Sequence, residues 1–317
     1  MKLFVFAATL IPLFGWSTSP APAAYPERTI TIICASGAGG IVDVTARVLA
    51  DQLSRILGRT VVVQNEPGAG STIAIGSVAK AAKDGYTLLI IGSGISVVSE
   101  LYPKANIDVI RDLAPISVVG VTPMALVVHE SVPGRDYASF LAYLKAHPNE
   151  TTTGSNGRGS AGHLAMELFK KEAGVDVRYI PYKTTPQAHT DLIAGRLSMM
   201  ATSSLGDYAK FPMLRPLAVT ITERWKALPD VPTLHELGLK DYEATSWVSL
   251  MAPKGTPPDV IERLNDAVNT ALAESSLRDR FDKIGIILPR VTGPSFAASY
   301  LQQEIAKWSD ILRKSTD

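Results

Sequence analysis

Two patterns of apolar positions organise the first part of this chain. Thr29–Cys34 is a short apolar run rich in β-branched residues, which predicts a buried strand. Asp43–Leu57 places its apolar residues three and four positions apart, which predicts a helix with one buried face, and Gly58 supplies a stop for it. The same two patterns predict a strand at Thr60–Val63, a small-residue helix at Thr72–Ala82 and a strand at Tyr86–Ile91.

The pattern begins again after Pro123. Alternation of strands and helices at this rhythm predicts an α/β fold with parallel sheets covered by helices on both faces, and 317 residues suffice for two such lobes. The long amphipathic C-terminal helices are expected to pack on the first lobe. The predicted strands are Ala125–His129, Val175–Ile180, Leu197–Ala201, Leu217–Ile221 and Trp247–Met251; the predicted helices are Tyr137–His147, Ala161–Glu172, Pro186–Ala194, Pro258–Ala273, Leu277–Ile284 and Pro294–Lys314.

The N-terminal segment has the character of a secretory signal peptide. Met1-Lys2 gives a short basic start, an apolar stretch follows at Leu3–Phe14, and Ala21–Ala24 has the small residues of a cleavage site. The apolar stretch is too short and too broken by proline and glycine to read as a membrane span. We therefore predict that residues 1–23 are removed, with the cut after Ala23 or Ala24, and that the mature protein is exported.

Composition and charge exclude several kinds of partner. The chain carries 31 basic and 30 acidic residues, and removal of residues 1–23 takes away Lys2 alone, which leaves 30 of each. This balance gives no indication of binding to nucleic acid or to an anionic membrane, both of which favour a basic surface. The single cysteine, Cys34, cannot form an internal disulfide or a thiolate zinc cage and is expected to be buried. We predict no metal and no cofactor, because no metal-ligand spacing links the scattered histidines His129, His147, His189 and His235.

Two glycine-rich loops, about 120 residues apart, carry the candidate chemistry. Each of them, Ser36–Gly40 and Gly154–Ser160, lies between a short apolar run and a predicted helix. A helix after such a loop directs unpaired backbone N–H groups and a partial positive charge at the gap, so it can hold an anion without lysine or arginine. The alternative is an ordinary strand-to-helix turn. Because ligands of open α/β sheets bind beyond the carboxyl ends of the strands, we interpret the loops as two sides of one cleft for a small acidic ligand.

Several residues near these loops have two interpretations. Asp43 either stabilises the helix N-terminus or, if the ligand carries an ammonium group, contacts the ligand. Arg158 either makes a bidentate contact to a carboxylate or points to solvent. His163 is more readily a structural or capping histidine than a base. Gly157–Gly162 has the form of a dinucleotide-binding fingerprint, but Thr151–Thr153 is a poor strand and no acid follows at the required distance.

The sequence contains no recognisable catalytic motif. It has no G-x-S-x-G elbow, no H-E-x-x-H pair and no Walker lysine, and the acid pair Asp108 and Asp112 reads as solvated surface. We therefore predict a binding protein and not an enzyme. An extracytoplasmic hydrolase or oxidoreductase would need a nucleophile–base pair in the cleft.

The motifs of the mature chain resemble those of one family, the periplasmic substrate-binding proteins of tripartite tricarboxylate transporters, or Bug family. The resemblance spans essentially all of residues 25–317. The matching motifs are Tyr25-Pro26, Gly39-Gly40-x-x-Asp43 with Ala46-Arg47, Asn65-Glu66-Pro67-Gly68-Ala69-Gly70, Asp84-Gly85-Tyr86-Thr87-Leu88-Leu89, Leu101-Tyr102-Pro103, Gly159-Ser160-x-x-His163-Leu164-Ala165, Pro181-Tyr182-Lys183, Leu217-Ala218-Val219-Thr220, Leu228-Pro229-Asp230-Val231-Pro232-Thr233 and Ala252-Pro253-x-Gly255-Thr256-Pro257.

This resemblance implies a two-lobed, type II periplasmic-binding-protein fold with a ligand cleft between the lobes. It also implies a periplasmic protein, expected to be a monomer, that captures a mono- or dicarboxylate or an aromatic acid and delivers it to membrane permease subunits. A ligand sensor that presents the acid to a membrane signalling partner is the alternative. The ligand-binding candidates carried over by position are Ser36, Gly37, Ala38, Gly39, Gly40, Ile41, Asp43, Ser93, Ser155, Asn156, Gly157, Arg158, Gly159, Ser160 and, more weakly, Thr202.

The chain departs from the family pattern at several positions around the predicted cleft. Gly37 and Ala38 stand where the family commonly has prolines, and Ile41 and Val42 stand where it has small or hydroxyl residues. Ser198 replaces a usual aspartate, and Thr184 replaces a usual glycine. These changes leave the ligand open, and the bulkier Ile41 favours a ligand with an apolar portion. We predict one lobe at 24–124 plus 249–317 and the other at 125–248, with hinge crossings near 122–125 and 246–250.

Overall fold

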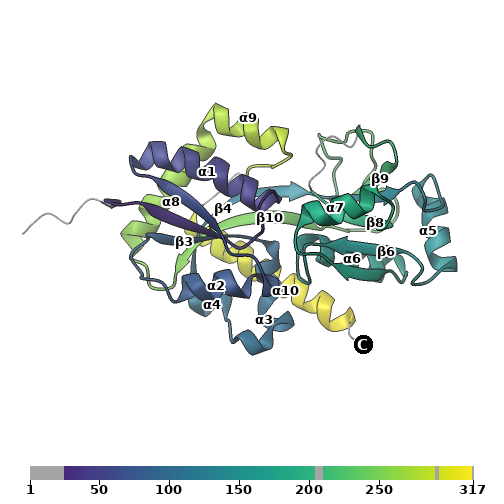
Figure 1. Ribbon diagram of the computed structural model, residues 1–317, viewed down its shortest axis with the longest axis horizontal. Helices are drawn as coiled ribbons and strands as arrows, with labels where there is room; N and C mark the ends of the chain where they lie inside the picture. The colour runs from purple at the N-terminus through teal and green to yellow at the C-terminus, as the bar shows by residue number, and fades with distance from the viewer. Residues whose placement is uncertain (1–24, 204–209, 290–292, 316–317) are drawn as a thin grey trace, which may run out of the picture.

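The computed structural model describes residues 25–203, 210–289 and 293–315, so the predicted signal peptide at residues 1–23 lies outside the described part of the chain. The described residues form two lobes, each built on one five-stranded sheet (Figure 1). We call the lobe with strands β1 to β4 and β10 the first lobe, and the lobe with strands β5 to β9 the second lobe. Both sheets contain parallel and antiparallel strands, so the prediction of parallel sheets is only partly right.

The sheet of the first lobe has the strand order β2-β1-β3-β10-β4. Strands β1, β2 and β3 are parallel, as predicted, whereas β10 is antiparallel to both of its neighbours. Alternate residues of β1 enter two different cores, with Ile32 under helices α1 and α8 and Ile33 facing helix α2. A strand covered on both faces is apolar throughout, which explains the continuous run in the sequence. The strands are β1 Ile30–Cys34, β2 Val61–Asn65, β3 Thr87–Gly92, β4 Leu113–Pro123 and β10 Thr245–Pro253.

The sheet of the second lobe has the order β7-β6-β8-β5-β9, with β5 antiparallel to β8 and β9. The segment judged a poor strand at Thr151–Thr153 is in fact the start of β6, which pairs with β7 and β8. Its threonines and glycine are buried between neighbouring strands, so tertiary pairing outweighs weak local propensity. The strands are β5 Ala125–His129, β6 Thr152–Ser155, β7 Arg178–Pro181, β8 Met199–Thr202 and β9 Leu214–Val219.

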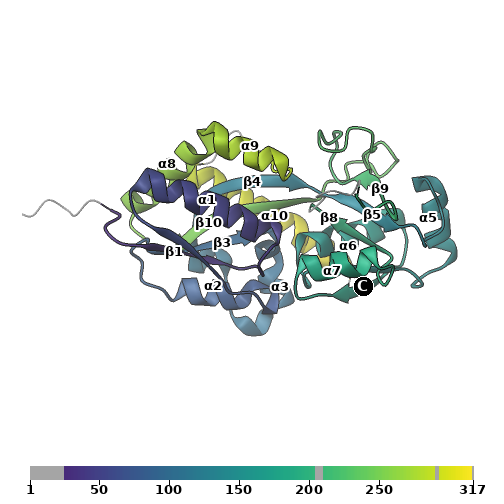
Figure 2. The same cartoon turned by 45° about the horizontal axis from the view of Figure 1, so that its top comes forward.

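The helices cover both faces of the sheets and match most of the predicted positions (Figures 1 and 2). Helix α1 ends at Gly58, which adopts the left-handed conformation (φ 64°) that the stop signal requires. The helices of the first lobe are α1 Ile41–Leu57, α2 Thr72–Ala79, α3 Val98–Leu101, α4 Val109–Asp112, α8 Pro258–Ala273, α9 Ser275–Lys283 and α10 Pro294–Ser315, with short 3₁₀ segments at Ala69–Ser71, Ser93–Val97 and Pro103–Ala105. Those of the second lobe are α5 Tyr137–Ala146, α6 Ala161–Ala173 and α7 Thr185–Ile193.

Two connecting segments run between the lobes, and they lie next to each other. One runs from β4 to β5 through Met124, and the other enters β10 after Ala244. The hydroxyl of Thr220 ties them, because it accepts a hydrogen bond from the Met124 N–H (3.0 Å) and donates one to the Ala244 carbonyl (2.6 Å). β10 pairs with β4 over the whole of Thr245–Pro253, so the predicted boundary at residues 248 and 249 falls inside a strand of the first sheet. Which residues move as one lobe remains a prediction.

The C-terminal helix α10 forms a third connection and corrects one expectation. Leu301 packs in the core of the first lobe, but Trp308 and Ile311 belong to the core of the second lobe. Figure 2 shows α10 passing beneath the first sheet toward α6. The expectation that the C-terminal helices pack on the first lobe therefore agrees with α8, α9 and the start of α10, but not with the later turns of α10. No helix in the described ranges is long and apolar enough to cross a membrane.

Candidate ligand-binding site

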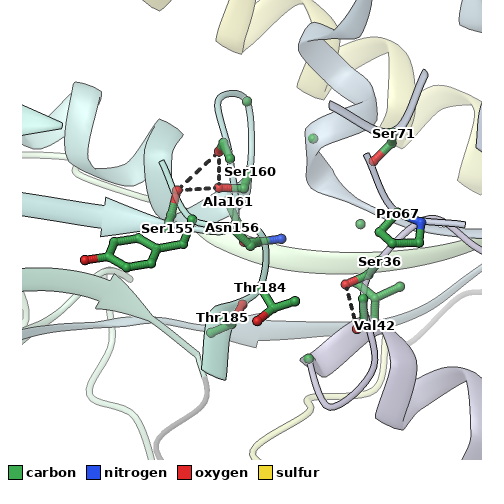
Figure 3. A pocket seen from close by; sticks show the side chains of 18 of the residues that line it. Ser36, Val42, Pro67, Ser71, Ser155, Asn156, Ser160, Ala161, Thr184 and Thr185 are labelled. Carbon is green, nitrogen blue, oxygen red and sulfur yellow. Dashed lines mark hydrogen bonds between the residues drawn. The ribbon is translucent and has the colours of Figure 1, made fainter. Parts of the chain in front are cut away.

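A cavity of about 760 Å³ lies between the two lobes and receives walls from both of them. Figure 3 shows the two sides: Ser36, Val42, Pro67 and Ser71 come from the first lobe and face side chains of the second lobe across the gap. The second-lobe side chains labelled there are Ser155, Asn156, Ser160, Ala161, Thr184 and Thr185. Both glycine-rich loops therefore border one shared space, which is the arrangement that the sequence predicts.

Four helices begin at this cavity, two from each lobe. Their N-terminal positions on the wall are Gly40 for α1, Ser71 for α2, Ser160 for α6 and Thr184 for α7. At Gly40 and Ser71 no side chain caps the helix, so backbone N–H groups of the first turn remain without an intrahelical partner. Each helix end contributes about half a positive charge. The cavity is thus a strongly electropositive space built mainly from the backbone.

Asp43 holds the first loop through a hydrogen bond to its backbone and does not line the cavity. Its carboxylate accepts hydrogen bonds from the Gly39 N–H (3.0 Å) and from the Asn65 amide (2.8 Å), and it pairs with Arg47 at 2.9 Å. Burial raises the pKa of Asp43, but these donors outweigh burial and leave the pKa lowered. The structure also leaves Ala38 and Gly39 off the cavity wall, because this turn of the loop projects toward the second lobe, where a Cβ on Gly39 would lie 3.6 Å from Pro186.

The second loop is held by a cluster of hydroxyl groups. The Ser160 hydroxyl lies 2.7 Å from the Ser155 hydroxyl (Figure 3). It also lies 2.8 Å from the Gly157 carbonyl, and the Ser155 hydroxyl lies 2.8 Å from the hydroxyl of Tyr179. Ser160 also caps α6 by accepting a hydrogen bond from the His163 N–H. These hydroxyls are already engaged with one another. They fix the conformation of the loop on the cavity wall without further ordering.

His163 is a structural histidine, as its position in the sequence suggests. Its Nδ1 atom accepts a hydrogen bond from the Gly159 N–H (3.2 Å), and its ring packs edge-on against Tyr179. Burial lowers its pKa to about 4, although Glu167 acts in the opposite direction. The ring is therefore neutral near pH 7 and holds the glycine loop in place.

Ser93 and Thr202, which were also predicted, both lie on the cavity wall, but only Thr202 has a hydrogen-bond partner for its hydroxyl. The Ser93 side chain, in a residue only 2% exposed, has no hydrogen-bond partner for its hydroxyl. The Thr202 hydroxyl lies 3.0 Å from Nε2 of His189, whose pKa burial lowers. A buried hydroxyl without a partner is unfavourable, so Ser93 is the position where a ligand oxygen gains most from hydrogen bonding.

Of the predicted candidates, the cavity wall contains Ser36, Gly37, Gly40, Ile41, Ser93, Ser155, Asn156, Gly157, Arg158, Gly159, Ser160 and Thr202. Sequence reasoning did not select the two other helix starts, Pro67–Ser71 and Thr184–Gln187, or the residues between the strands at the base of the cavity. The sequence did contain signals for both helix starts. Pro67–Gly70 reads as a turn before a helix, and a threonine followed three residues later by a glutamine, as in Thr184 and Gln187, is typical of a helix N-terminus. The further wall residues include Met124, Tyr182, Lys183, Met200, Ser203 and Ser246.

The side chains of the wall carry positive charge and no negative charge. Arg158 and Lys183 are its two cationic residues, and none of the described residues that line it is an aspartate or glutamate. The described ranges also contain no group of three or more residues that could hold a metal ion. The described wall therefore offers hydroxyl, amide and cationic groups but no carboxylate.

The lobes approach each other closely at two places on the cavity wall. On one side, a Cβ added to Gly37 would lie 2.8 Å from Cγ2 of Thr184 in the other lobe. On the other side, a Cβ added to Gly94 would lie 2.8 Å from the Gly159 carbonyl oxygen. At Gly94 the neighbour is backbone of the opposite lobe, so glycine is needed there, whereas Gly37 faces only the methyl group of a threonine side chain.

Known proteins resemble this chain over nearly its whole length. The model of the tripartite tricarboxylate transporter family receptor matches residues 45–316. Protein BugT of Bordetella pertussis is 34% identical over 318 residues, which cover 99% of this chain and 97% of BugT. The periplasmic binding protein BugD is 30% identical with a TM-score of 0.85, over 92% of this chain and 99% of BugD. An R. palustris protein solved with adipate is 32% identical with a TM-score of 0.87, over 92% of this chain and 98% of that protein.

Proposed function

Because this chain belongs to the tripartite tricarboxylate transporter receptor family, whose members are substrate-binding receptors and not enzymes, we propose that it captures a small carboxylate between its lobes. It then delivers the acid to the membrane permease subunits of such a transporter. The solved relative with adipate supports a carboxylate as the ligand. The relative BugD is a periplasmic binding protein, which supports export of this chain to the periplasm through residues 1–23. We expect the receptor to act as a monomer.

The convergence of four helix N-termini on one cavity is the observation that carries this proposal. Each such end stabilises a nearby anion by roughly 0.3–1 kcal/mol at exposed sites and more where water is excluded. Each lobe supplies two of these ends, so a carboxylate in the cavity is stabilised most when the lobes are together. Ligand capture and hinge closure are therefore the same event.

The apolar part of the wall supports an acid with an apolar body. Ile41 and Val42 extend from the start of α1, and Met124 and Met200 lie at the junction of the lobes. These side chains cannot hydrogen-bond, and they exclude water from the space between the helix ends. An aliphatic or aromatic acid fits both surfaces, with its carboxylate at the N–H groups and its hydrocarbon against the side chains.

The sensor alternative shares the binding step and differs only in the partner that recognises the closed form. No feature of the described residues favours it over delivery to a permease. Genes next to the coding sequence discriminate the two: permease genes indicate uptake, and a sensor kinase gene indicates signalling.

Calorimetric titration with a panel of organic acids tests the proposal. Bound small molecules are first removed by unfolding and refolding, and adipate, succinate and benzoate are then titrated. We expect at least one acid to bind, and Ser93→Ala to weaken that binding by roughly tenfold to 100-fold, because a hydrogen bond to a charged group contributes about 1.5–3 kcal/mol. The same variant should not lower the free energy of unfolding, since it removes a buried hydroxyl that has no partner.

Ser96→Ala is the matched control for this experiment. Ser96 is also buried and its hydroxyl also lacks a partner, but it does not line the cavity. Its removal should leave affinity unchanged. Absence of binding by every acid, or equal loss of affinity in the two variants, would contradict the proposal.

A further inference from the structure

The distribution of charge around the cavity restricts the acids that it accepts. An ammonium group inside a protein needs a carboxylate, carbonyl groups or water as partners, because burying it unpaired is costly. Here the helix ends present N–H donors to the cavity, and the charged side chains of its described wall are Arg158 and Lys183. We propose that this receptor selects acids without an ammonium group and discriminates against amino acids, an inference that rests on the proposed function.

The two carboxylates placed just behind the wall are already engaged. Asp43 is 3% exposed and receives bonds from Gly39, Arg47 and Asn65. On the opposite side, Asp191 accepts a hydrogen bond from the hydroxyl of the wall residue Tyr182 (2.9 Å) and pairs with Arg196. Neither carboxylate can turn to an ammonium without losing these bonds. These two acids therefore support residues of the wall and its loops and do not offer the cavity a negative charge.

The remaining side-chain acceptors on the described wall are uncharged hydroxyl and amide oxygens, and several of the hydroxyls already have partners. Ser155 and Ser160 bond to each other and to the loop backbone, and the Thr184 hydroxyl accepts the Gln187 N–H at the start of α7. An ammonium placed among them would lie close to four helix N-termini, whose partial charges repel it. A hydroxyl substituent in the same place meets no such repulsion and can accept hydrogen bonds.

Sets of acids that differ at one carbon test this inference by calorimetric titration. Succinate, malate and aspartate have hydrogen, hydroxyl and ammonium at the same position; adipate and 2-aminoadipate form a longer pair. In the set with the tighter parent acid, we expect the ammonium compound to bind weaker than its parent by about tenfold or more. Malate should bind with an affinity close to that of succinate. This comparison separates the effect of the ammonium charge from the effect of a larger substituent.

The outcomes distinguish this inference from the proposed function. Binding of amino acids as tight as that of the matched acids would overturn the inference and leave carboxylate capture standing. If neither acids nor amino acids bind, the proposed function fails and the inference fails with it. Tight binding of the acids together with weak binding of their amino analogues supports both.

A charge placed on the wall provides a second test. Gln187 lines the cavity in the first turn of α7, where the helix dipole favours a negative charge, so Gln187→Glu is compatible with folding. It should narrow the preference for succinate over aspartate by about threefold or more, since it adds a negative charge at the wall. Gln302→Glu, on an exposed position of α10 away from the cavity, is the matched control and should leave the ratio unchanged. An unchanged ratio in Gln187→Glu would contradict the inference.

Discussion

Removal of the Glu304 carboxylate is expected to destabilise the whole molecule, because one of its oxygens links the two lobes. Oε2 of Glu304 accepts a hydrogen bond from Nε1 of Trp247 (2.8 Å) and another from Nε1 of Trp308 (2.9 Å). Trp247 lies on the crossing strand β10 and packs in a core of the first lobe, whereas Trp308 lies in the core of the second lobe. Both indoles are 1% exposed, and Glu304 itself is 8% exposed.

The magnitude follows from these two bonds. A hydrogen bond to a charged group contributes about 1.5–3 kcal/mol, and the two bonds share one acceptor, so Glu304→Ala should lower the free energy of unfolding by roughly 3–5 kcal/mol. This is a large part of the roughly 5–15 kcal/mol of a typical domain. Glu304→Gln retains an oxygen in the same place and loses only the charge, so its loss should be about 1–2 kcal/mol.

Urea unfolding followed by tryptophan fluorescence measures both variants, since two of the reporting indoles contact this carboxylate. Gln303→Ala, on the exposed side of the same helix, serves as the control and should stay within about 0.5 kcal/mol of the parent protein. A loss below about 1 kcal/mol in Glu304→Ala, or an equal loss in Glu304→Gln, would refute the assignment of this carboxylate as the link between the cores.

Two further predictions concern closure and pH. Gly94→Ala should weaken acid binding by about tenfold or more without lowering stability, because the atoms nearest its new Cβ belong to the backbone of Gly159 and Ser160 in the opposite lobe. Gly76→Ala, whose new Cβ has no neighbour within 4 Å, is the control, and equal titrations of the two variants would contradict this reasoning. In the folded protein the pKa of His163 is about 4, whereas in the unfolded chain it is 6.5. Below pH 6.5 the unfolded state therefore binds a proton that the folded state does not bind. The contribution of His163 to the free energy of unfolding is complete above pH 6.5 and is lost as the pH falls toward 4. The loss of unfolding free energy reaches about 2 kcal/mol near pH 5. His163→Gln cannot take up this proton, so urea unfolding of the variant should show a smaller fall in stability between about pH 6.5 and pH 5. The same pH dependence in the variant and the parent protein would contradict this reasoning.

The fold was largely accessible from the sequence wherever local pattern and tertiary pairing agree. The predictions for Ala125–His129 and Pro258–Ala273 match β5 and α8 residue for residue. The strand at Leu113–Pro123 was missed, because it contains two prolines and a glycine that normally end strands. Its partner β10 accommodates them with two register irregularities, and this compensation comes from a segment more than 120 residues away.

The candidate site was accessible only in part, for a related reason. A glycine-rich loop indicates a helix start from local sequence alone, so Ser36–Gly40 and Gly154–Ser160 could be predicted as parts of the site. The starts of α2 and α7 have weaker sequence signals, and only the folded structure brings them to the cavity. The role of Asp43 had a readable hint in Arg47, one helical turn later. Its second partner, Asn65, approaches from β2 and could be recognised only in three dimensions.

A cavity built from helix ends separates affinity from selectivity. The N–H groups that attract an anion belong to the backbone of α1, α2, α6 and α7, so side-chain substitution removes them only if the helix itself is lost. The side chains between those ends, such as Ile41, Met200 and Thr184, decide which body and which charge the acid can carry. Because the backbone of the opposite lobe lies against Gly94, a larger residue there acts first on the approach of the lobes. Ligand preference in this frame can therefore change through a few wall substitutions while the ability to bind an acid is retained.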